Sequence, residues 1–306
     1  MSTSLWSTSE LSYARVPLSS AADQSSSSAS SAKRTDGRSA LSFRDVALST
    51  STSKAQGAIA SSTVTVNGNA VDGGGQTKVE AGVRAEVDSM HGDNGGKIIH
   101  LSTLLTSLFS AASLPPTFLS QLVVIPNHKA WTLYLDVLIE SSLGGNVIDT
   151  CIIAARSALA TVRLPLTRPV GFESDDVTGS AMDQDSGFSG LVKGGKAGAK
   201  AVDFELVDAG LVVGGGGQRL KDWEKLPIGV TLSLVNQLPF LDATALEESV
   251  ASSQIVYCFT STGDLCGMKQ LGEGEIEFAR LSGLTKDAQR IASEMLVVLN
   301  KKLHDA

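Results

Sequence analysis

The pattern of apolar and polar positions predicts β-strands in the first half of the chain. Valine and other β-branched residues are frequent from Ser42 to Val87, and the turn signals Asn67-Gly68 and Gly73–Gly75 divide this stretch. We therefore expect antiparallel strands of one sheet. Further along, Trp131–Glu140 alternates apolar and polar residues as a long strand would, and the apolar run Leu119–Pro126 predicts a short buried strand before it.

The second half again shows the pattern of apolar residues that is typical of β-strands. Ile228–Val235 and Gln237–Thr244 are apolar enough to predict two further strands. The stretch Ser253–Gly274 predicts a hairpin that turns at Ser261–Asp264, because a polar turn with a glycine separates two apolar runs.

Three stretches switch to the spacing of an amphipathic helix. Between 98 and 112 the apolar residues fall on one face, and Pro115-Pro116 ends that helix. A second helix is expected over Val147–Val162, with a buried side of small and aliphatic residues. The chain closes with a helix over Thr285–Leu303, for which Thr285 is the expected N-cap.

The order of these elements divides the chain into two similar halves and an insertion. Strands, helix, strand, helix, insertion, strands, helix is the order of an α+β fold, with mixed or antiparallel sheets and helices packed on one side. The halves, 33–170 and 223–306, have similar patterns of apolar and polar residues, which indicate a duplicated unit. The insertion, 171–222, is acidic and glycine-rich, and residues 201–213 within it suit a strand pair. We expect the serine-rich tail, 1–32, to be disordered, because it can bury too little apolar surface to offset its ordering entropy.

Composition narrows the possible functions. The 306 residues carry a formal net charge of −7, so any RNA contact must come from a local basic patch. No run of about 20 apolar residues predicts a membrane span, and the N-terminus lacks the apolar core of a secretory signal. The four histidines form no cluster, so we expect no zinc site and no cofactor.

The three cysteines have no metal-binding or redox spacing. Cys151, Cys258 and Cys266 therefore suit reduced thiols in a reducing compartment. Cys258 and Cys266 flank the predicted hairpin turn, so they are either reduced neighbours or a facing pair.

Two glycine-rich motifs do not meet the requirements of nucleotide binding. Gly190–Ala197 has the spacing of a Walker A loop, but Ala197 replaces the serine or threonine that holds magnesium. An acidic linker also precedes the motif where a strand is needed. Gly214–Gly217 is a glycine run without the dinucleotide-binding spacing.

A cluster of carboxylates begins at the end of the strand predicted at Gln237–Thr244. Its members are Asp242, Glu247 and Glu248. Such a cluster can bind Mg²⁺ and support phosphoryl chemistry. The alternative is a polar strand end that enters a turn or a helix.

The loop Leu143–Asn146 has the strand–glycine–helix arrangement of many phosphate-binding loops. Gly144 and Gly145 leave the backbone open at the N-terminus of the next helix, where anions bind to free N–H groups. However, the first helical residues are Val147, Ile148 and Asp149, two apolar and one negative. Asp149 favours the helix dipole by itself and would repel a phosphate. The local chemistry therefore argues against a phosphate site.

Four stretches in this order resemble RNase PH-like subunits of the RNA exosome. They are Lys33–Arg38, Gly75–Val87, Trp131–Leu159 and Leu241–Ile276. The resemblance extends over most of 33–303 apart from the insertion. It implies a duplicated βαβα-type unit and a hexameric ring around a central RNA channel. Active members of this family degrade RNA in the 3′ to 5′ direction by phosphorolysis.

The resemblance also implies that the catalytic positions have changed. Val147 stands where active members have a phosphate-binding arginine, and Gln254 where they have the catalytic aspartate, while the acidic pair is kept as Glu247-Glu248. Valine cannot neutralise a phosphate, and an amide cannot replace a carboxylate as an acid or a metal ligand. The chain is thus expected to be a non-catalytic structural subunit that guides RNA. The alternatives are an active phosphate-dependent 3′–5′ exoribonuclease and a divergent paralogue that no longer assembles.

The resemblance further implies partners and RNA contacts. Expected partners are other RNase PH-like exosome subunits in the ring, the exosome cap subunits and RNA, with no membrane, and the expected places are nucleus, nucleolus and cytoplasm. Candidates for RNA contact are Arg34, Arg38, Lys78 and Arg84; the alternative for each is a solvated surface charge. Between Glu86 and Lys97 the chain is shorter than the family pattern, which leaves a lost strand or an incomplete gene model as explanations.

Overall fold

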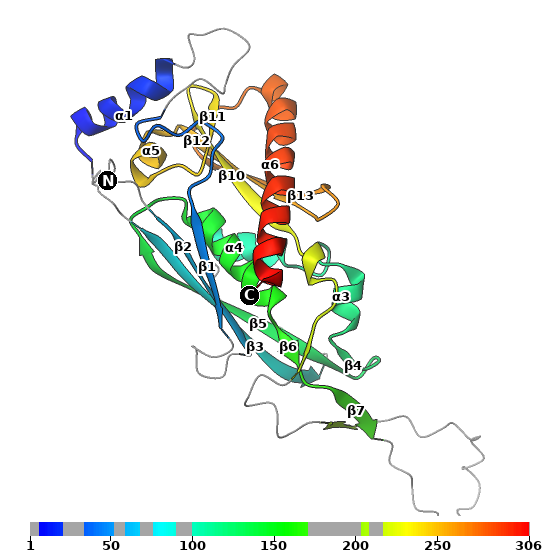
Figure 1. Cartoon of the computed structure of the whole chain (residues 1–306). Coiled ribbons are helices and arrows are strands. Elements are labelled where there is room, and N and C mark those ends of the chain that lie inside the picture. Colours follow the sequence, from blue (N-terminus) through cyan, green and yellow to red (C-terminus); the bar gives the residue numbers. More distant parts are fainter. Residues whose placement is uncertain are drawn as a thin grey trace, which may run out of the picture.

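Helix α4 (Val147–Ala160) lies where two antiparallel sheets meet and is buried along most of its length (Figure 1). It contacts strands of both sheets, so one helix joins the two halves of the core. The computed structural model describes residues 6–20, 34–51, 59–67, 76–89, 100–170, 203–207 and 217–305, without the side chains of 17–20, 51, 84–89, 100 and 169. The Walker A-like motif Gly190–Ala197, the glycines at 214–216 and residues 90–97 lie outside the described residues.

The first sheet has the strand order β1–β2–β3–β5–β4, and all of its neighbours are antiparallel. Its strands are β1 (Val46–Ser51), β2 (Ala60–Val66), β3 (Thr77–Ser89), β4 (Val123–Ile125) and β5 (Lys129–Ser142). The strands predicted over 42–87 and 131–140 are confirmed. The expected buried strand at 119–126 is confirmed only as short β4, in which Ile125 is buried and Val123 is exposed. Strand β3 pairs directly with β5 from Thr77 to Ser89.

The second sheet has the order β11–β10–β12–β13. Its strands are β10 (Ile228–Val235), β11 (Leu238–Leu241), β12 (Ser253–Phe259) and β13 (Leu265–Gly272). The predicted hairpin is confirmed, because β12 and β13 pair across the polar turn. Strand β10 is buried at every position, because helices cover it from more than one side, and this explains its continuous apolar run.

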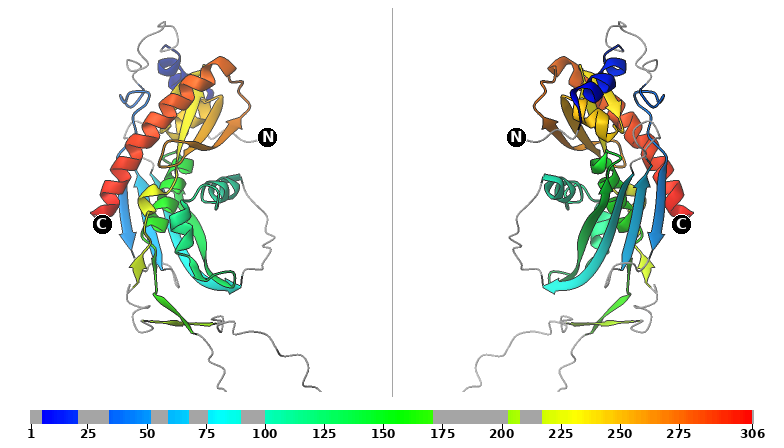
Figure 2. Two further views of the ribbon diagram at one scale, coloured as in Figure 1. Left: turned by 90° about the vertical axis from the view of Figure 1, so that its right-hand side faces the viewer. Right: turned by 90° about the vertical axis from the view of Figure 1, so that its left-hand side faces the viewer.

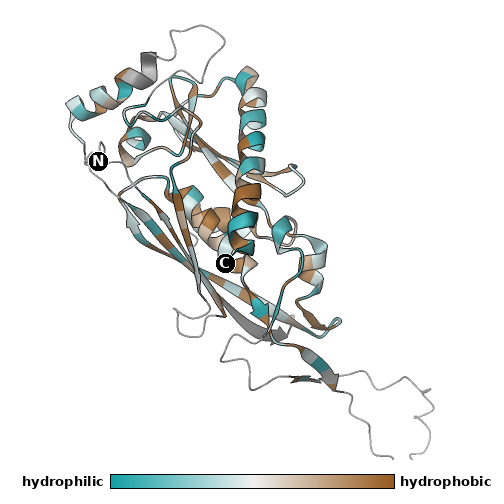
Figure 3. Cartoon of the chain, in the orientation of Figure 1, coloured by the Kyte–Doolittle hydropathy of each residue, from teal (hydrophilic) through white to brown (hydrophobic). Residues whose placement is uncertain are grey.

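Two long helical segments cover the second sheet (Figure 2). Helix α6 (Phe278–His304) contacts β10 and β12, and α2 (His100–Leu108) contributes leucines that pack against Val256 and Cys258 of β12. Figure 2 shows these two helices on opposite sides of the molecule. Apolar residues gather on α4 and the strands that face it (Figure 3).

Helix α6 begins earlier than the sequence predicted. It starts at Phe278, and Thr285 lies inside it, where its hydroxyl donates to the carbonyl of Leu281 at 2.8 Å. The prediction of Thr285 as an N-cap is therefore wrong. The reason is that Leu281 and Leu284 already pack on the core, so burial extends the helix past the apparent cap. The remaining short helices are α3 (Pro116–Ser120), the 3₁₀ turn η2 (Trp223–Lys225) and α5 (Ala245–Val250).

The N-terminal tail was expected to be disordered, but residues 8–20 form helix α1 (Thr8–Ser20). Ala14 of α1 is fully buried in a small cluster with Val235, Phe240 and Leu246, and Trp6 and Leu11 pack on its edge. The prediction failed because the apolar surface that α1 covers belongs to α5, β10 and β11, more than 200 residues away in the sequence. Composition of the tail alone does not reveal that surface.

The insertion predicted over 171–222 includes residues that belong to the core. Strand β9 (Gln218–Arg219) pairs with β6 (Arg163–Leu164), and Leu220 is buried in the main core. Strand β8 (Asp203–Leu206) pairs with β7 (Thr167–Val170), so its partner precedes the insertion. The second member of the predicted strand pair, at 208–213, lies outside the described residues. No helix in the described part of the chain is long and apolar enough to span a bilayer.

The packing of α1 generates a first prediction. Ala14→Asp places a carboxylate in the buried cluster, so we expect α1 to detach and trypsin to cleave faster after Arg15, which lies in α1. Val16→Asp is the matched control, because Val16 lies on the exposed side of the same helix at 64% exposure. Limited proteolysis followed by mass spectrometry measures both. Equal cleavage of the two variants would show that α1 is not held by its Ala14 face.

Candidate functional site

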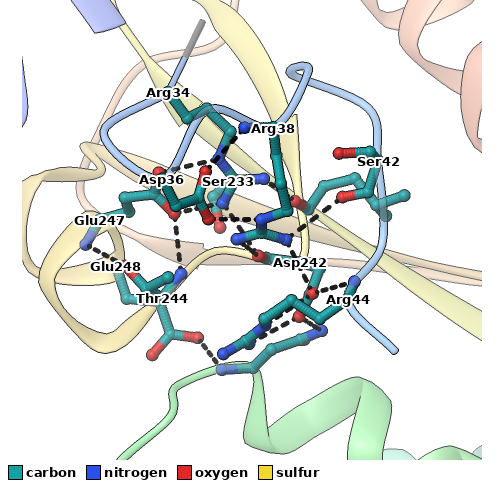
Figure 4. Close-up of polar contacts among 12 residues, drawn as sticks. Arg34, Asp36, Arg38, Ser42, Arg44, Ser233, Asp242, Thr244, Glu247 and Glu248 are labelled. Carbon is teal, nitrogen blue, oxygen red and sulfur yellow. Dashed lines mark hydrogen bonds and ion pairs between the residues drawn. The ribbon is translucent and has the colours of Figure 1, made fainter. Parts of the chain in front are cut away.

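The carboxylate of Asp242 is the centre of a buried polar network (Figure 4). Arg44 donates to it from its backbone N (2.8 Å), Nε (2.8 Å) and Nη2 (2.7 Å). Arg38 donates from Nη1 at 3.0 Å, and Asn146 from Nδ2 at 2.7 Å. The network therefore ties together the segment before β1, the loop before α4 and the end of β11.

Electrostatics keep this network ionised although it is buried. Burial alone would raise the pKa of Asp242, but the hydrogen bonds and charge of Arg44, followed by the charge of Arg38, lower it. Burial alone would lower the pKa of Arg44, but Asp242 and then Glu247 and Glu248 raise it. The arginine–carboxylate pair therefore compensates two buried charges that would each be costly alone.

A second buried ion pair joins Arg34 to Glu247. Arg34 donates from Nε to one carboxylate oxygen of Glu247 at 2.8 Å and from Nη2 to the other, and it also donates to the carbonyl of Leu241 at 2.7 Å. Glu247 closes a capping box with Thr244, the N-cap of α5. The acidic cluster predicted from the sequence is thus a strand end that enters a helix.

The glycine loop before α4 is held tightly between the two halves of the molecule. Thr77 donates from its hydroxyl to the carbonyl of Gly145 at 2.6 Å, and Arg44 donates to the carbonyl of Gly144 at 2.7 Å. Gly145 has a φ of 72°, and a Cβ there would lie 2.4 Å from the backbone N of Ala245. The glycines therefore allow close backbone contact with α5, which leaves no room for a ligand on that side.

A carboxylate of the chain itself occupies the N-terminus of α4. The backbone N of Asn146 donates to Oε1 of Glu248 at 2.8 Å, and Asn146 has a left-handed backbone with a φ of 52°. Burial raises the pKa of Glu248, and the N–H of Asn146 and the charge of Arg44 offset this only in part. Glu248 is thus placed where an anion at this helix N-terminus would bind.

The two positions that the resemblance marked as changed lie beside this carboxylate. Val147 follows Asn146 and is half-buried against the main core. Gln254, on β12, lies within hydrogen-bonding reach of Glu248 and donates to the hydroxyl of Ser233 at 3.3 Å. Val147, Glu248 and Gln254 are therefore neighbours in the structure, and neither Val147 nor Gln254 carries a charge.

Asp149, in the first turn of α4, lies in the interior of the protein. It is fully buried, and the hydroxyl of Thr231 on β10 donates to its Oδ1 at 2.6 Å. Burial raises the pKa of Asp149 to about 7, and the hydrogen bonds from Thr231 lower it only in part. The carboxyl thus contacts the second sheet through Thr231 and also lies within hydrogen-bonding reach of Asn146 in the loop, and its expected repulsion of a phosphate stays a prediction.

The four residues proposed for RNA contact have different surroundings. Arg34 is 3% exposed and Arg38 is half-buried, and both are paired with carboxylates, so neither is a solvated surface charge. The sequence hides this because their partners are more than 200 residues away. The side chain of Lys78 is 42% exposed and pairs with Glu140 at 2.7 Å. Arg84 belongs to β3, but its side chain lies outside the described residues.

Sequence reasoning missed Arg44 and Asn146, although both contact Asp242. Arg44 precedes a strand and Asn146 ends a glycine turn, and nothing in their neighbourhoods distinguishes them from surface residues. Among the described residues, no group of three His, Cys, Asp or Glu side chains is placed to hold a metal ion. The three cysteines are free thiols, with Cys258 buried and Cys266 exposed.

Comparisons with known proteins agree with this fold. Residues 225–282 match the model of the 3′ exoribonuclease family, domain 2. Over 95% of this chain, the structure is similar to a chain of an archaeal exosome core, with a TM-score of 0.60, 18% identity and 96% of that chain covered. A chain of the Archaeoglobus fulgidus exosome with RNA bound to the active site gives a TM-score of 0.59 at 17% identity, covering 94% of this chain and 96% of that one. The predicted α+β, RNase PH-like fold is confirmed.

Curated relatives carry exosome names. Exosome complex component Rrp42 of Sulfurisphaera tokodaii is 24% identical over 186 residues, which are 61% of this chain and 54% of the relative. Exosome complex component Rrp42 of Saccharolobus islandicus is 22% identical, covering 88% of this chain and 90% of the relative. The putative exosome complex exonuclease RRP42 of Dictyostelium discoideum is 22% identical, covering 60% and 47%. The predicted resemblance to exosome subunits is confirmed, although the chain spans about half the length of the first and third of these relatives.

The buried ion pairs generate a prediction about stability. Arg34→Ala leaves Glu247 without its cation inside the protein, so we expect a loss of about 3–5 kcal/mol in the free energy of unfolding. Lys78→Ala is the control, because it removes an exposed partner of Glu140 and should leave stability unchanged. Urea unfolding followed by circular dichroism measures both. A loss for Arg34→Ala no larger than that for Lys78→Ala would contradict the structural role of Arg34.

The buried Asp149 generates a prediction about pH. Its folded-state pKa of about 7 lies above its ordinary value of 3.8, so between these values the folded chain keeps a proton that the unfolded chain releases. The free energy of unfolding should therefore fall as pH rises from about 4 to 7. We expect Asp149→Asn to remove this fall, because an amide does not titrate there. Asp305→Asn, at an exposed position, should keep the wild-type slope. Urea titrations at several pH values measure the free energy of unfolding of each variant. If the free energy of unfolding of Asp149→Asn falls with pH as steeply as that of the wild type, the prediction is refuted.

Proposed function

We propose that this chain is a non-catalytic, RNase PH-like subunit of an exosome ring, which helps to form the RNA channel and to guide RNA in 3′–5′ processing and decay. The observation that carries the proposal is the contact between Glu248 and the N–H of Asn146. A phosphorolytic site needs inorganic phosphate near that helix N-terminus, and here the chain's own carboxylate fills the position.

The charges around the loop also oppose phosphate binding. Arg44 is the cation nearest the loop carbonyls, but it already makes three contacts to the carboxylate of Asp242. Val147 supplies no charge, and Gln254 cannot protonate a leaving group as a carboxylic acid does. A phosphate would therefore meet two carboxylates, Asp242 and Glu248, with no free cation among the described residues of this network to compensate them.

The remaining parts of the proposal rest on the resemblance and on the names of the relatives. Proteins named exosome components suggest assembly with other RNase PH-like subunits in a hexameric ring, together with cap subunits and RNA. Nucleus, nucleolus and cytoplasm are the proposed places of action, and rRNA processing is one proposed task. Such a role requires a rigid scaffold, which the two buried ion pairs supply without any reaction at the site.

The decisive measurement is phosphorolysis by the purified chain. Incubated with single-stranded RNA and inorganic phosphate, it should release no nucleoside diphosphates above a phosphate-free blank, whereas an active RNase PH-like enzyme assayed in parallel should. Co-expression with RNase PH-like partners should yield a stable complex that contains this chain. Phosphate-dependent release of diphosphates would show an active exoribonuclease, and a soluble monomer that ignores these partners would show a paralogue that no longer assembles.

A further inference from the structure

Two arginines face each other on the short ladder between β6 and β9. Arg163 and Arg219 are Cα partners across this antiparallel pair, so their side chains start from adjacent points on one face. Like charges placed directly opposite destabilise a sheet. Burial, and next to it the charge of Arg163, lowers the pKa of Arg219, which is consistent with this proximity.

Arg219 is held in place by the ends of two helices. Its Nε donates to the carbonyl of Ala160, the last residue of α4, at 2.7 Å, and its Nη atoms lie 3.4 Å from the carbonyl of Leu303 on α6. Its guanidinium also stacks on Trp223 at 3.9 Å from the ring centroid. These contacts explain Arg219 as a cation at two negative helix ends.

Arg163 has no such explanation. It is exposed, and among the described residues it has no hydrogen bond or ion pair to an acidic group. Glu224 lies close enough to act on Arg219, and its carboxylate lies 2.9 Å from Nε2 of His304, but among the described residues no ion pair joins it to Arg163. The fold therefore places a free guanidinium against a fixed one, at a cost, in a chain whose net charge is −7.

The neighbouring ladder shows the ordinary arrangement. On the β7–β8 pair, Arg168 is the Cα partner of Glu205, so opposite charges face each other. Both ladders are short, and their first strands, β6 and β7, are only a few residues apart in the chain. The like-charged pair is thus a local property of β6 and β9 and does not reflect a general surplus of arginine on this surface.

We propose that the Arg163–Arg219 pair binds a phosphate of the RNA backbone, so that this face of the chain is a second, non-catalytic contact for single-stranded RNA. Two guanidinium groups on adjacent strands can share one phosphate, and the planar fork of arginine suits its oxygens. A bound phosphate would also relieve the repulsion between the two charges. The pair lies at the C-terminal end of α4, about 20 Å from Asn146 at the other end.

The contact would read the backbone without reading bases. Trp223, on which Arg219 stacks, is only 6% exposed, and the ring of His304 also lies against it, tilted by 60° at 4.9 Å between ring centroids. At this exposure its ring cannot stack a base, and stacking is the usual companion of sequence-tolerant RNA binding. The choice of RNA over an acidic protein segment rests on the proposed function of the chain as an RNA guide.

The test compares two variants that lose the same charge. Arg163→Gln should raise the melting temperature of the free chain by about 1–2 °C, because it removes a like-charged cross-strand pair. It should weaken binding of a fluorescent single-stranded RNA about three- to tenfold and lower the salt slope by about 0.7, the value for one phosphate contact. Arg168→Gln should leave RNA binding unchanged and should not raise the melting temperature, because it removes an opposite-charge pair.

Fluorescence anisotropy at several salt concentrations and differential scanning fluorimetry supply these measurements on the full chain. Equal RNA affinity of the two variants would overturn the proposal, and so would a lower melting temperature of Arg163→Gln. Poly-glutamate serves as the acidic competitor: if Arg163→Gln weakens its binding but not that of RNA, the site takes an acidic protein. Phosphate-dependent release of diphosphates, or no assembly with RNase PH-like partners, would refute the proposed function. The comparison between Arg163→Gln and Arg168→Gln would still show whether this arginine pair binds RNA.

Discussion

The buried carboxylate of Asp242 is the constraint on which the rest of this structure depends. Arg44 and Asn146 reach it from segments 198 and 96 residues away in the sequence, and Arg38 from a third position. A buried ion pair adds little stability over an apolar replacement, but an arrangement that leaves one partner unpaired is strongly disfavoured. The network therefore acts mainly by disfavouring other arrangements of the chain. Only one packing of the N-terminal segment, the α4 loop and α5 pairs all of these buried charges.

This packing has a chemical consequence for the loop before α4. The same arginine that holds Asp242 also binds the carbonyl of Gly144, and Glu248 takes the N–H of Asn146. Gly145 then lies too close to Ala245 for any inserted group. What looks like an anion cradle in the sequence is thus an internal joint between two halves of the chain. A rigid joint of this kind suits the proposed structural role in a ring, and that role does not depend on catalysis.

The sequence predicted what depends on local pattern and missed what depends on distant partners. The strands, the hairpin between β12 and β13 and the existence of α4 followed from periodicity and turn residues. The burial of Arg34 and the order of α1 could not, because each is decided by groups more than 200 residues away. The burial of Asp149 was missed for a related reason: position in the first turn of a helix does not say which way the side chain faces. The replacement of catalytic residues by Val147 and Gln254 stays a prediction, because it rests on the resemblance alone.

Helix α4 connects the two places where charge matters most. At its N-terminus the chain supplies its own anion, Glu248, so the helix dipole is satisfied internally. At its C-terminus Arg219 satisfies the last carbonyl, and Arg156, buried within α4, fixes the adjoining turn by donating to the carbonyls of Leu226 and Glu224. The second end thus carries more positive charge than the helix needs, since Arg163 adds a guanidinium with no internal partner. An excess of cations on a rigid support is what an external anion requires, so the polarity of this one helix separates an end that is closed to ligands from an end that is open to them.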